Sequence, residues 1–124
     1  MSLGIVLDCA DPEQLARFWA RALRYRAGPY QPPYIILRPE AGDGPKFVLQ
    51  LVPEPKQVKN RMHLDLWVAD IEAEARRLSE LGARRQSADP LEEIGSRWIV
   101  MADPEGNEFC LCREAKSPPA APTR

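Results

Sequence analysis

The chain has a single histidine, which lies in the stretch HLDLWVAD at residues 63–70. His63, Asp65 and Trp67 alternate with apolar residues, so in a β-strand their side chains would share one face. On that face the imidazole could ligate a metal ion or hydrogen-bond a bound molecule, with Asp65 orienting it. The indole of Trp67 could stack on a planar ligand. Packing alone is the alternative explanation for both aromatic rings, so these residues mark a candidate site.

Two of the three cysteines, Cys110 and Cys112, lie two residues apart in the strand-like stretch NEFCLCRE. The residues that alternate with them are apolar, which predicts that both thiols face away from the core side of that strand. On an extended backbone this spacing is near the far limit for a disulfide, so we expect none between them. Together with His63 the thiols would suit zinc by ligand type. Without an activating base or a positive environment, however, we expect Cys110 to be an inert, half-buried thiol.

A further polar candidate is Gln50, in the strand-like run KFVLQLV at residues 46–52. Strand parity separates this run into two sets of side chains. The set expected to be buried against a helix contains Phe47, Leu49 and Leu51. The set facing the other way contains Val48, Gln50 and Val52. Gln50 could therefore hydrogen-bond to a polar group of a ligand, or it could simply hydrogen-bond to a neighbouring strand.

An internal repeat indicates which elements position these residues. ADPEQLARFW at residues 10–19 and ADIEAEARRL at residues 69–78 share five of ten aligned positions at an offset of 59 residues. Asp11 and Asp70 are suited to cap the two predicted helices, and Gly82 is a natural stop for the second. The apolar stripe of the first helix is Leu15, Phe18, Trp19, Ala22 and Leu23; that of the second is Ile71, Ala75, Leu78 and Leu81.

A strand-like run precedes each predicted helix and three short extended runs follow it, which predicts an α+β fold of two tandem βαβββ units. We place a single domain at residues 1–114, with units at 3–52 and 61–113 and a connector at 53–60. The proline-rich segment 115–124 is predicted to be a disordered tail. The apolar strand faces are expected to pack against the helices, which leaves the face of His63 open.

Composition excludes several kinds of partner. The chain has 124 residues, a net charge of −1 and no long run of either sign, which argues against a nucleic-acid partner. No apolar run is long enough to span a membrane, and the start of the chain does not resemble a signal peptide. Three cysteines without a secretory signal favour reduced thiols and a cytoplasmic location.

The duplicated units, the stretch HLDLWVADIEAEARRLSELGA and the turn in MADPEGNEFCL resemble the vicinal oxygen chelate superfamily, and within it the glyoxalase-like and bleomycin-resistance-like proteins. The resemblance covers about residues 3–113. The turn at 103–107 suits a tight connection because Gly106 tolerates a positive φ. The resemblance implies cupped mixed sheets with the helices on the outer face, a small-molecule ligand in the cavity and a homodimer.

The resemblance also implies a divalent metal held by the first and last strands of each unit. Carried over by position, the second unit offers His63 and Cys110. The first unit offers Gly4 and either Val48 or Gln50, of which only Gln50 could ligate. The metal set, if an ion is bound, would be His63, Gln50 and Cys110. This set lacks the family's carboxylate and one whole ligand, so no cofactor is the expectation and a divalent metal is the alternative.

The sequence therefore predicts a small-molecule binder of the resistance or sequestration type, without the usual catalytic metal site. The residues predicted to bind the ligand are His63, Asp65, Trp67, Gln50 and Cys110. The alternative is a divalent-metal-dependent lyase, isomerase or dioxygenase with an altered ligand set, and a third possibility is a structural or regulatory module. The sequence leaves open whether the protein is an enzyme.

Overall fold

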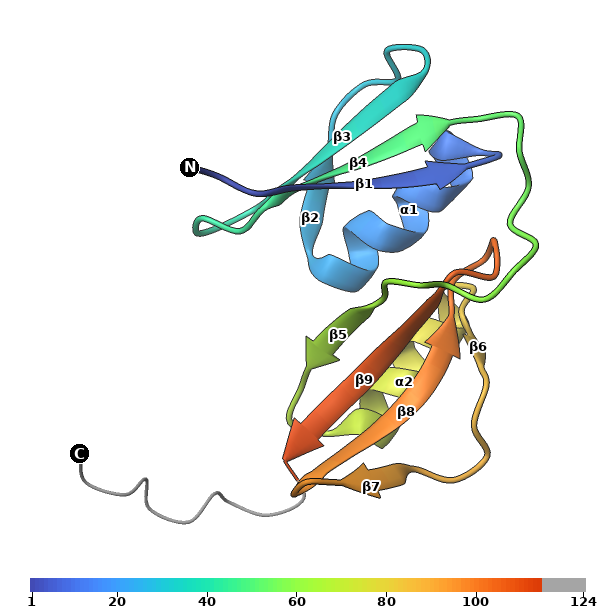
Figure 1. Ribbon diagram of the computed structural model, residues 1–124. Helices are drawn as coiled ribbons and strands as arrows, with labels where there is room; N and C mark the ends of the chain where they lie inside the picture. Colours follow the sequence, from blue (N-terminus) through green and yellow to red (C-terminus); the bar gives the residue numbers. More distant parts are fainter. Residues whose placement is uncertain (115–124) are drawn as a thin grey trace. The chain divides into compact units, whose positions relative to one another are not determined.

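The computed structural model describes residues 1–114, which form two compact units (Figure 1). The first unit contains Met1–Val58 together with Asp103–Gly106, and the second contains Lys59–Ala102 and the described residues 107–114. The predicted tail at 115–124 lies outside the described residues. None of the helices in the described part of the chain has the length and apolar character needed to cross a membrane.

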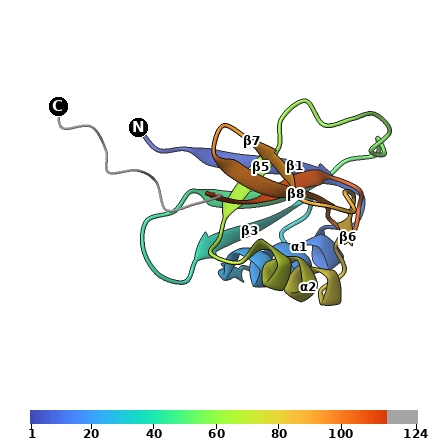
Figure 2. The ribbon, with the colours of Figure 1, turned by 90° about the horizontal axis from the view of Figure 1, so that it is seen from below.

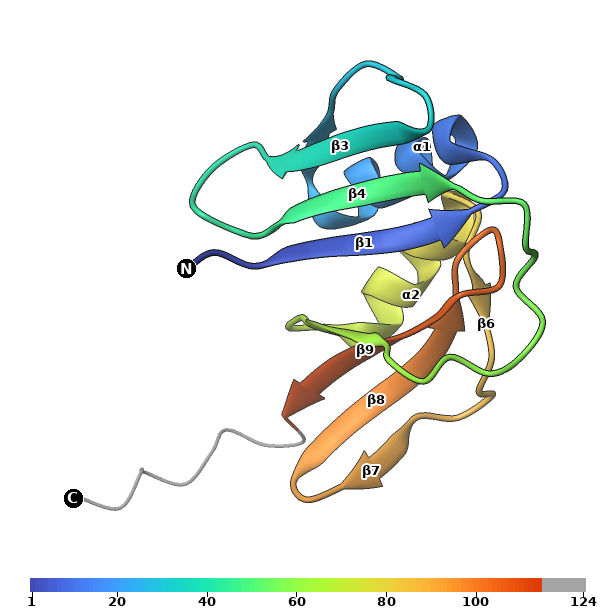
Figure 3. The same ribbon diagram turned by 45° about the horizontal axis from the view of Figure 1, so that its top comes forward.

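The first unit is a four-stranded mixed sheet with one helix. Its elements are β1 (Gly4–Cys9), α1 (Pro12–Leu23), β2 (Tyr25–Ala27), β3 (Tyr34–Pro39) and β4 (Lys46–Leu51). The strand order is β1-β4-β3-β2, with β1 parallel to β4 and the other pairs antiparallel (Figure 3). Figure 2 shows α1 on one side of β1 and β3.

The second unit repeats this plan. Its elements are β5 (Leu64–Trp67), α2 (Ile71–Glu80), β6 (Arg84–Arg85), β7 (Leu91–Glu93), β8 (Ser96–Ala102) and β9 (Glu108–Glu114). The order is β5-β9-β8-β6, and β7 pairs with β8 as an addition. The predicted α+β fold of two βαβββ units is thus confirmed, and β7 is an element that the sequence analysis did not anticipate. Its three residues, LEE, carry no period-2 alternation.

Both helices begin where the capping residues predict. The Asp11 carboxylate accepts a 3.1 Å hydrogen bond from the Gln14 N–H, and Asp70 accepts one of 3.0 Å from the Ala73 N–H. The helix ends differ from one another. α2 ends two residues before Gly82, which has φ +117°, whereas α1 ends at Leu23 and is capped by Arg24, a non-glycine residue with φ +58°.

The first-unit core lies between α1 and the sheet. Trp19 is 2% exposed and stacks on Phe47 at 5.4 Å between ring centroids. Parity misplaces one residue of β4: Leu51, expected to be buried, is 40% exposed because it is the last residue of that strand. Val48 faces away from the helix side and is nevertheless only 8% exposed, because β4 lies between β1 and β3 and Val48 is flanked by Val6 and Ile36.

The turn between β8 and β9 belongs to the first unit and is hydrogen-bonded to α1 and to the start of that helix. Asp103, fully buried, accepts a 2.9 Å hydrogen bond from the Trp19 indole and a 2.8 Å bond from the Glu105 N–H. The Glu105 carboxylate accepts 2.8 Å bonds from the N–H groups of Ala10 and Asp11, at the start of α1. Gly106 has φ +87°, as the predicted tight turn requires.

Candidate functional site

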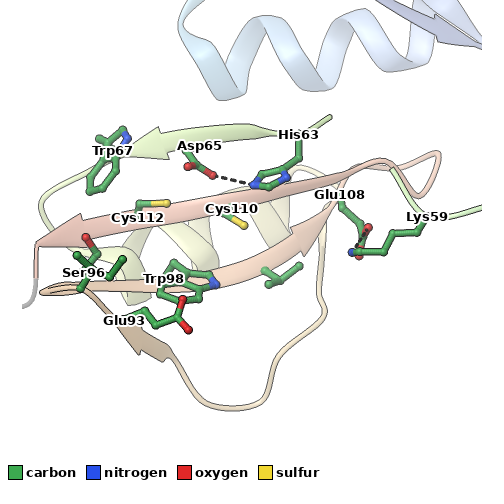
Figure 4. Close-up of a pocket in the computed structure, with 12 residues that line it drawn as sticks. Lys59, His63, Asp65, Trp67, Glu93, Ser96, Trp98, Glu108, Cys110 and Cys112 are labelled. Carbon is green, nitrogen blue, oxygen red and sulfur yellow. Dashed lines mark hydrogen bonds and ion pairs between the residues drawn. The ribbon is translucent and has the colours of Figure 1, made fainter. Parts of the chain in front are cut away.

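A pocket of about 440 Å³ opens on the second unit, on the sheet face that carries the single histidine (Figure 4). All of its walls belong to that unit, and we call it the second-unit pocket. Its lining residues are Lys59, His63, Asp65, Trp67, Glu93, Ile94, Ser96, Trp98, Val100, Glu108, Cys110 and Cys112. The structure thus brings together four of the five residues predicted to bind a ligand.

Strand register explains why these side chains converge. β5 and β9 are parallel, with Asp65 opposite Cys110 and Trp67 opposite Cys112. β8 runs antiparallel on the other side of β9 and places Trp98 opposite Cys112. Residues opposite one another in a ladder point to the same face. One row across three strands therefore reads Trp67, Cys112 and Trp98, with an indole on each side of a thiol.

The side chains of His63 and Asp65 contact one another at the edge of this pocket. The distance from His63 Nε2 to Asp65 Oδ1 is 3.2 Å, and the two side chains are 51% and 44% exposed. Ion pairs this exposed add little to stability. In this position the carboxylate of Asp65 lies beside the imidazole, where it can orient the ring (Figure 4).

The two pocket cysteines are protonated thiols at neutral pH. Burial, reinforced by the negative charge of Asp65, raises the pKa of Cys110 to about 11 and that of Cys112 to about 12. A high pKa leaves little thiolate at neutral pH, and the thiolate is the nucleophilic form. The pocket therefore offers these sulfur atoms as soft, weakly polar surface rather than as ready nucleophiles.

Gln50 lies elsewhere. It is on β4 of the first unit, opposite Asp8 and Tyr34, and it is not among the lining residues of the second-unit pocket. The registers also show which first-unit residue corresponds to Cys110. Val48 pairs with Val6 in the first unit, and Cys110 pairs with Asp65 in the second. Val48 therefore corresponds to Cys110, and Gln50 corresponds to Cys112.

These registers test whether the family's metal would fit. Of the first-unit positions that match His63 and Cys110, Gly4 has no side chain and Val48 has no donor atom, so these two positions offer no ligand to a metal. A different set does lie within the second unit. Ligand atoms of His63, Asp65 and Cys110 all lie within 4.8 Å of one another. A nitrogen, an oxygen and a sulfur donor suit a borderline ion such as zinc better than magnesium or calcium.

Seven of the lining residues were missed by the sequence analysis, and Trp98 and Glu93 show why. Trp98 has ambiguous parity within its own strand, and only its pairing with Cys112 shows which face it occupies. Glu93 reaches the pocket from β7, the strand that was not anticipated. In both cases the information lies in strand pairing, which no local sequence pattern carries.

Comparison with known proteins agrees with the fold. A family model described as a glyoxalase-like domain matches residues 4–112. A glyoxalase/bleomycin resistance protein/dioxygenase from Nocardioides has 15% identity and a TM-score of 0.73, over 100% of this chain and 89% of that chain. The fosfomycin resistance protein FosX from Mesorhizobium loti has 16% identity and a TM-score of 0.70, over 91% of each chain.

A third similar structure is a glyoxalase/bleomycin resistance protein/dioxygenase family enzyme from Burkholderia phytofirmans PsJN. It has 15% identity and a TM-score of 0.72, over 89% of this chain and 95% of that chain. At such identities the likeness to these structures shows the fold alone. A search among curated proteins finds none that matches the sequence.

Proposed function

Because the chain belongs to the family of glyoxalase-like domains, in the vicinal oxygen chelate superfamily, we propose that it binds a small organic molecule in the second-unit pocket. The observation that carries this proposal is the row of Trp67, Cys112 and Trp98 along the pocket. Two indoles separated by a protonated thiol offer apolar, polarisable surface on which a planar ligand can stack. The protein would act as a resistance- or sequestration-type binder, without the usual metal site of the superfamily.

Polar groups at the pocket edge would orient that ligand. His63, 3.2 Å from Asp65, presents an imidazole to the same pocket as the indoles. At the same end of the pocket as His63, Lys59 pairs with Glu108 at 2.8 Å, which leaves less free charge there (Figure 4). A pocket with mostly apolar walls and a few fixed polar groups is the usual form of a small-molecule site.

A screen of planar heteroaromatic compounds by thermal shift tests this proposal. We expect hits whose affinity falls about tenfold or more in Trp67→Ala and in Trp98→Ala, because each removes one stacking surface. Met62→Ala is the matched control, since Met62 is 76% exposed and does not line the pocket. Hits that bind both tryptophan variants as tightly as the unmodified protein would contradict the proposal.

A second function is favoured by one specific observation, the three mixed donors of His63, Asp65 and Cys110 within 4.8 Å. These residues would hold a zinc-type ion in a divalent-metal-dependent lyase, isomerase or dioxygenase with an altered ligand set. Such an ion supplies Lewis-acid polarisation of a substrate oxygen. The chain's own contribution would be to hold the ion through these three side chains and to place the substrate against Trp67.

We also propose a homodimer and a cytoplasmic location, as the resemblance to the superfamily implies. Leu91 and Ile94 of the second unit are 45% and 99% exposed, so a partner chain seated there would bury apolar surface. The free state of all three cysteines supports a reducing compartment. Sedimentation equilibrium checks the dimer: we expect twice the chain mass of 14.0 kDa, and a monomer would contradict it.

A further inference from the structure

A second depression, of about 240 Å³, lies on the first unit and has a different chemistry. It is lined by Arg26, Ala27, Gly28, Ile36, Arg38 and Pro39, with no carboxylate among them. Arg26 on β2 and Arg38 on β3 are direct partners in the antiparallel ladder, so their side chains rise from the same face. Two like charges directly opposite one another destabilise a sheet unless something neutralises them.

The residues around this pair do not neutralise it. Between Glu13 and Glu40 the sequence has five arginines and no acidic residue. Neither Arg26 nor Arg38 has an ion pair or a side-chain hydrogen bond within residues 1–114, whereas Arg77 pairs with a glutamate at 2.6 Å. The two guanidinium groups are therefore available to a ligand.

A third cation extends the positive row. Ile36 pairs with Val48 in the antiparallel ladder of β3 and β4. Arg38 lies two residues after Ile36, and Lys46 lies two residues before Val48. Antiparallel parity places Arg38 and Lys46 on the same face, at adjacent positions of β3 and β4. Three basic residues on three successive strands concentrate positive charge on this face.

We propose that Arg26 and Arg38 form a binding site for a doubly charged oxyanion, a phosphate group. Each guanidinium offers planar, paired donors that match two oxygens of a phosphate, and the two together balance a dianion. The small residues Ala27 and Gly28 leave the depression open between them. This site lies on the first unit, so it stands independently of the function proposed for the second-unit pocket.

Titration of the full chain with inorganic phosphate at low ionic strength tests the site, followed by NMR of the backbone amides at 26–28 and 36–38. We expect saturable shifts at one site per chain. Arg26→Gln and Arg38→Gln should each weaken binding about tenfold or more, because each removes charge-assisted hydrogen bonds. Arg17→Gln is the matched control: Arg17 is exposed on α1, does not line the depression, and should alter affinity less than about twofold. Shifts that never saturate, or an equal loss in the Arg17 variant, would overturn the proposal.

Two further measurements complete the test. A simple phosphate monoester is titrated beside inorganic phosphate: tighter binding of the monoester identifies a phosphorylated small molecule, and tighter binding of the free ion identifies phosphate itself. Succinate binding more tightly than either would overturn the phosphate assignment. Without phosphate, Arg26→Gln should unfold at or above the temperature of the unmodified protein, because it relieves the repulsion from Arg38. A lower unfolding temperature would show that Arg26 has a structural partner and would count against the site.

Discussion

The indole N–H of Trp19 donates a 2.9 Å hydrogen bond to the carboxylate of Asp103, and both residues are buried. This bond joins the middle of α1 to the turn after β8, across 84 residues of sequence. Hydrogen bonds to a buried charged group contribute more to the stability of the folded state than hydrogen bonds between neutral groups do, because the buried carboxylate has lost its water.

Trp19→Phe is therefore expected to destabilise the protein by about 1–3 kcal/mol, since it removes the donor and keeps an aromatic ring. The free energy of unfolding in urea measures this. Trp98→Phe makes the same chemical change in the pocket wall outside the core, where a loss within about 0.5 kcal/mol is expected. Equal losses in the two variants would show that the hydrogen bond to Asp103 is unimportant.

Alkaline pH should destabilise the fold through its buried thiols. Burial raises the pKa of Cys9 and Cys112 to about 12 and that of Cys110 to about 11, from an ordinary value of 9.0. The unfolded chain then loses these protons at lower pH than the folded chain does. Stability from this source is complete below pH 9.0 and is lost as the pH rises toward 11–12.

Urea unfolding midpoints on both sides of that window measure the effect. Cys112→Ala removes one of the three thiols, so its midpoint should fall less steeply with pH than that of the unmodified protein. Comparing the slopes, rather than the midpoints themselves, separates the proton linkage from any change in packing. Parallel slopes in the two proteins would rule out a contribution from Cys112.

Zinc binding distinguishes the two candidate functions of the second-unit pocket. If the mixed donor set is a metal site, calorimetry should show one zinc per chain, and His63→Ala, Asp65→Ala and Cys110→Ala should each weaken it at least about tenfold. Cys112→Ala provides a closely matched control, because the same type of residue is removed two positions further along β9. An absence of zinc binding by the unmodified protein would leave the metal-free binder as the remaining function.

Gln50→Ala belongs in the same experiment, because the family resemblance offered Gln50 as a ligand. Its place on β4 corresponds to Cys112 rather than to Cys110, so we expect its removal to change zinc affinity less than about twofold. A large loss would instead support the ligand set of His63, Gln50 and Cys110 that the family resemblance implies.

The sequence predicts those parts of the fold that depend on local patterns. Capping by Asp11 and Asp70 and the strand at Lys46–Leu51 follow from residue type and spacing within a few positions, and the structure confirms them. Burial at a strand end is not local in this sense. Leu51 has the right parity for the core yet is exposed, because parity states which way a side chain points and not whether anything covers it.

The candidate site shows the same division. Alternation within one strand predicts that His63, Asp65 and Trp67 share a face, and the structure places all three in the pocket. The opposite wall depends on how strands pair: Trp98 joins the pocket only because β8 pairs with β9 in one particular register. A shift of one residue would turn Trp98 to the other face, and nothing in the sequence of β8 alone fixes that register.

The turn at Asp103–Gly106 has a consequence for the order in which the chain matures during synthesis. The first unit has all of its own strands by Leu51, but the partner of its buried indole and the carboxylate that caps Ala10 and Asp11 come from this turn, half a chain later. While a ribosome is still translating the second repeat, Trp19 has no carboxylate from Asp103 to bond. A nascent chain released before residue 103 would thus contain all the strands of its first repeat but would lack the hydrogen-bond acceptors of Trp19, Ala10 and Asp11. Such a chain would be a natural target for proteases that degrade incomplete translation products.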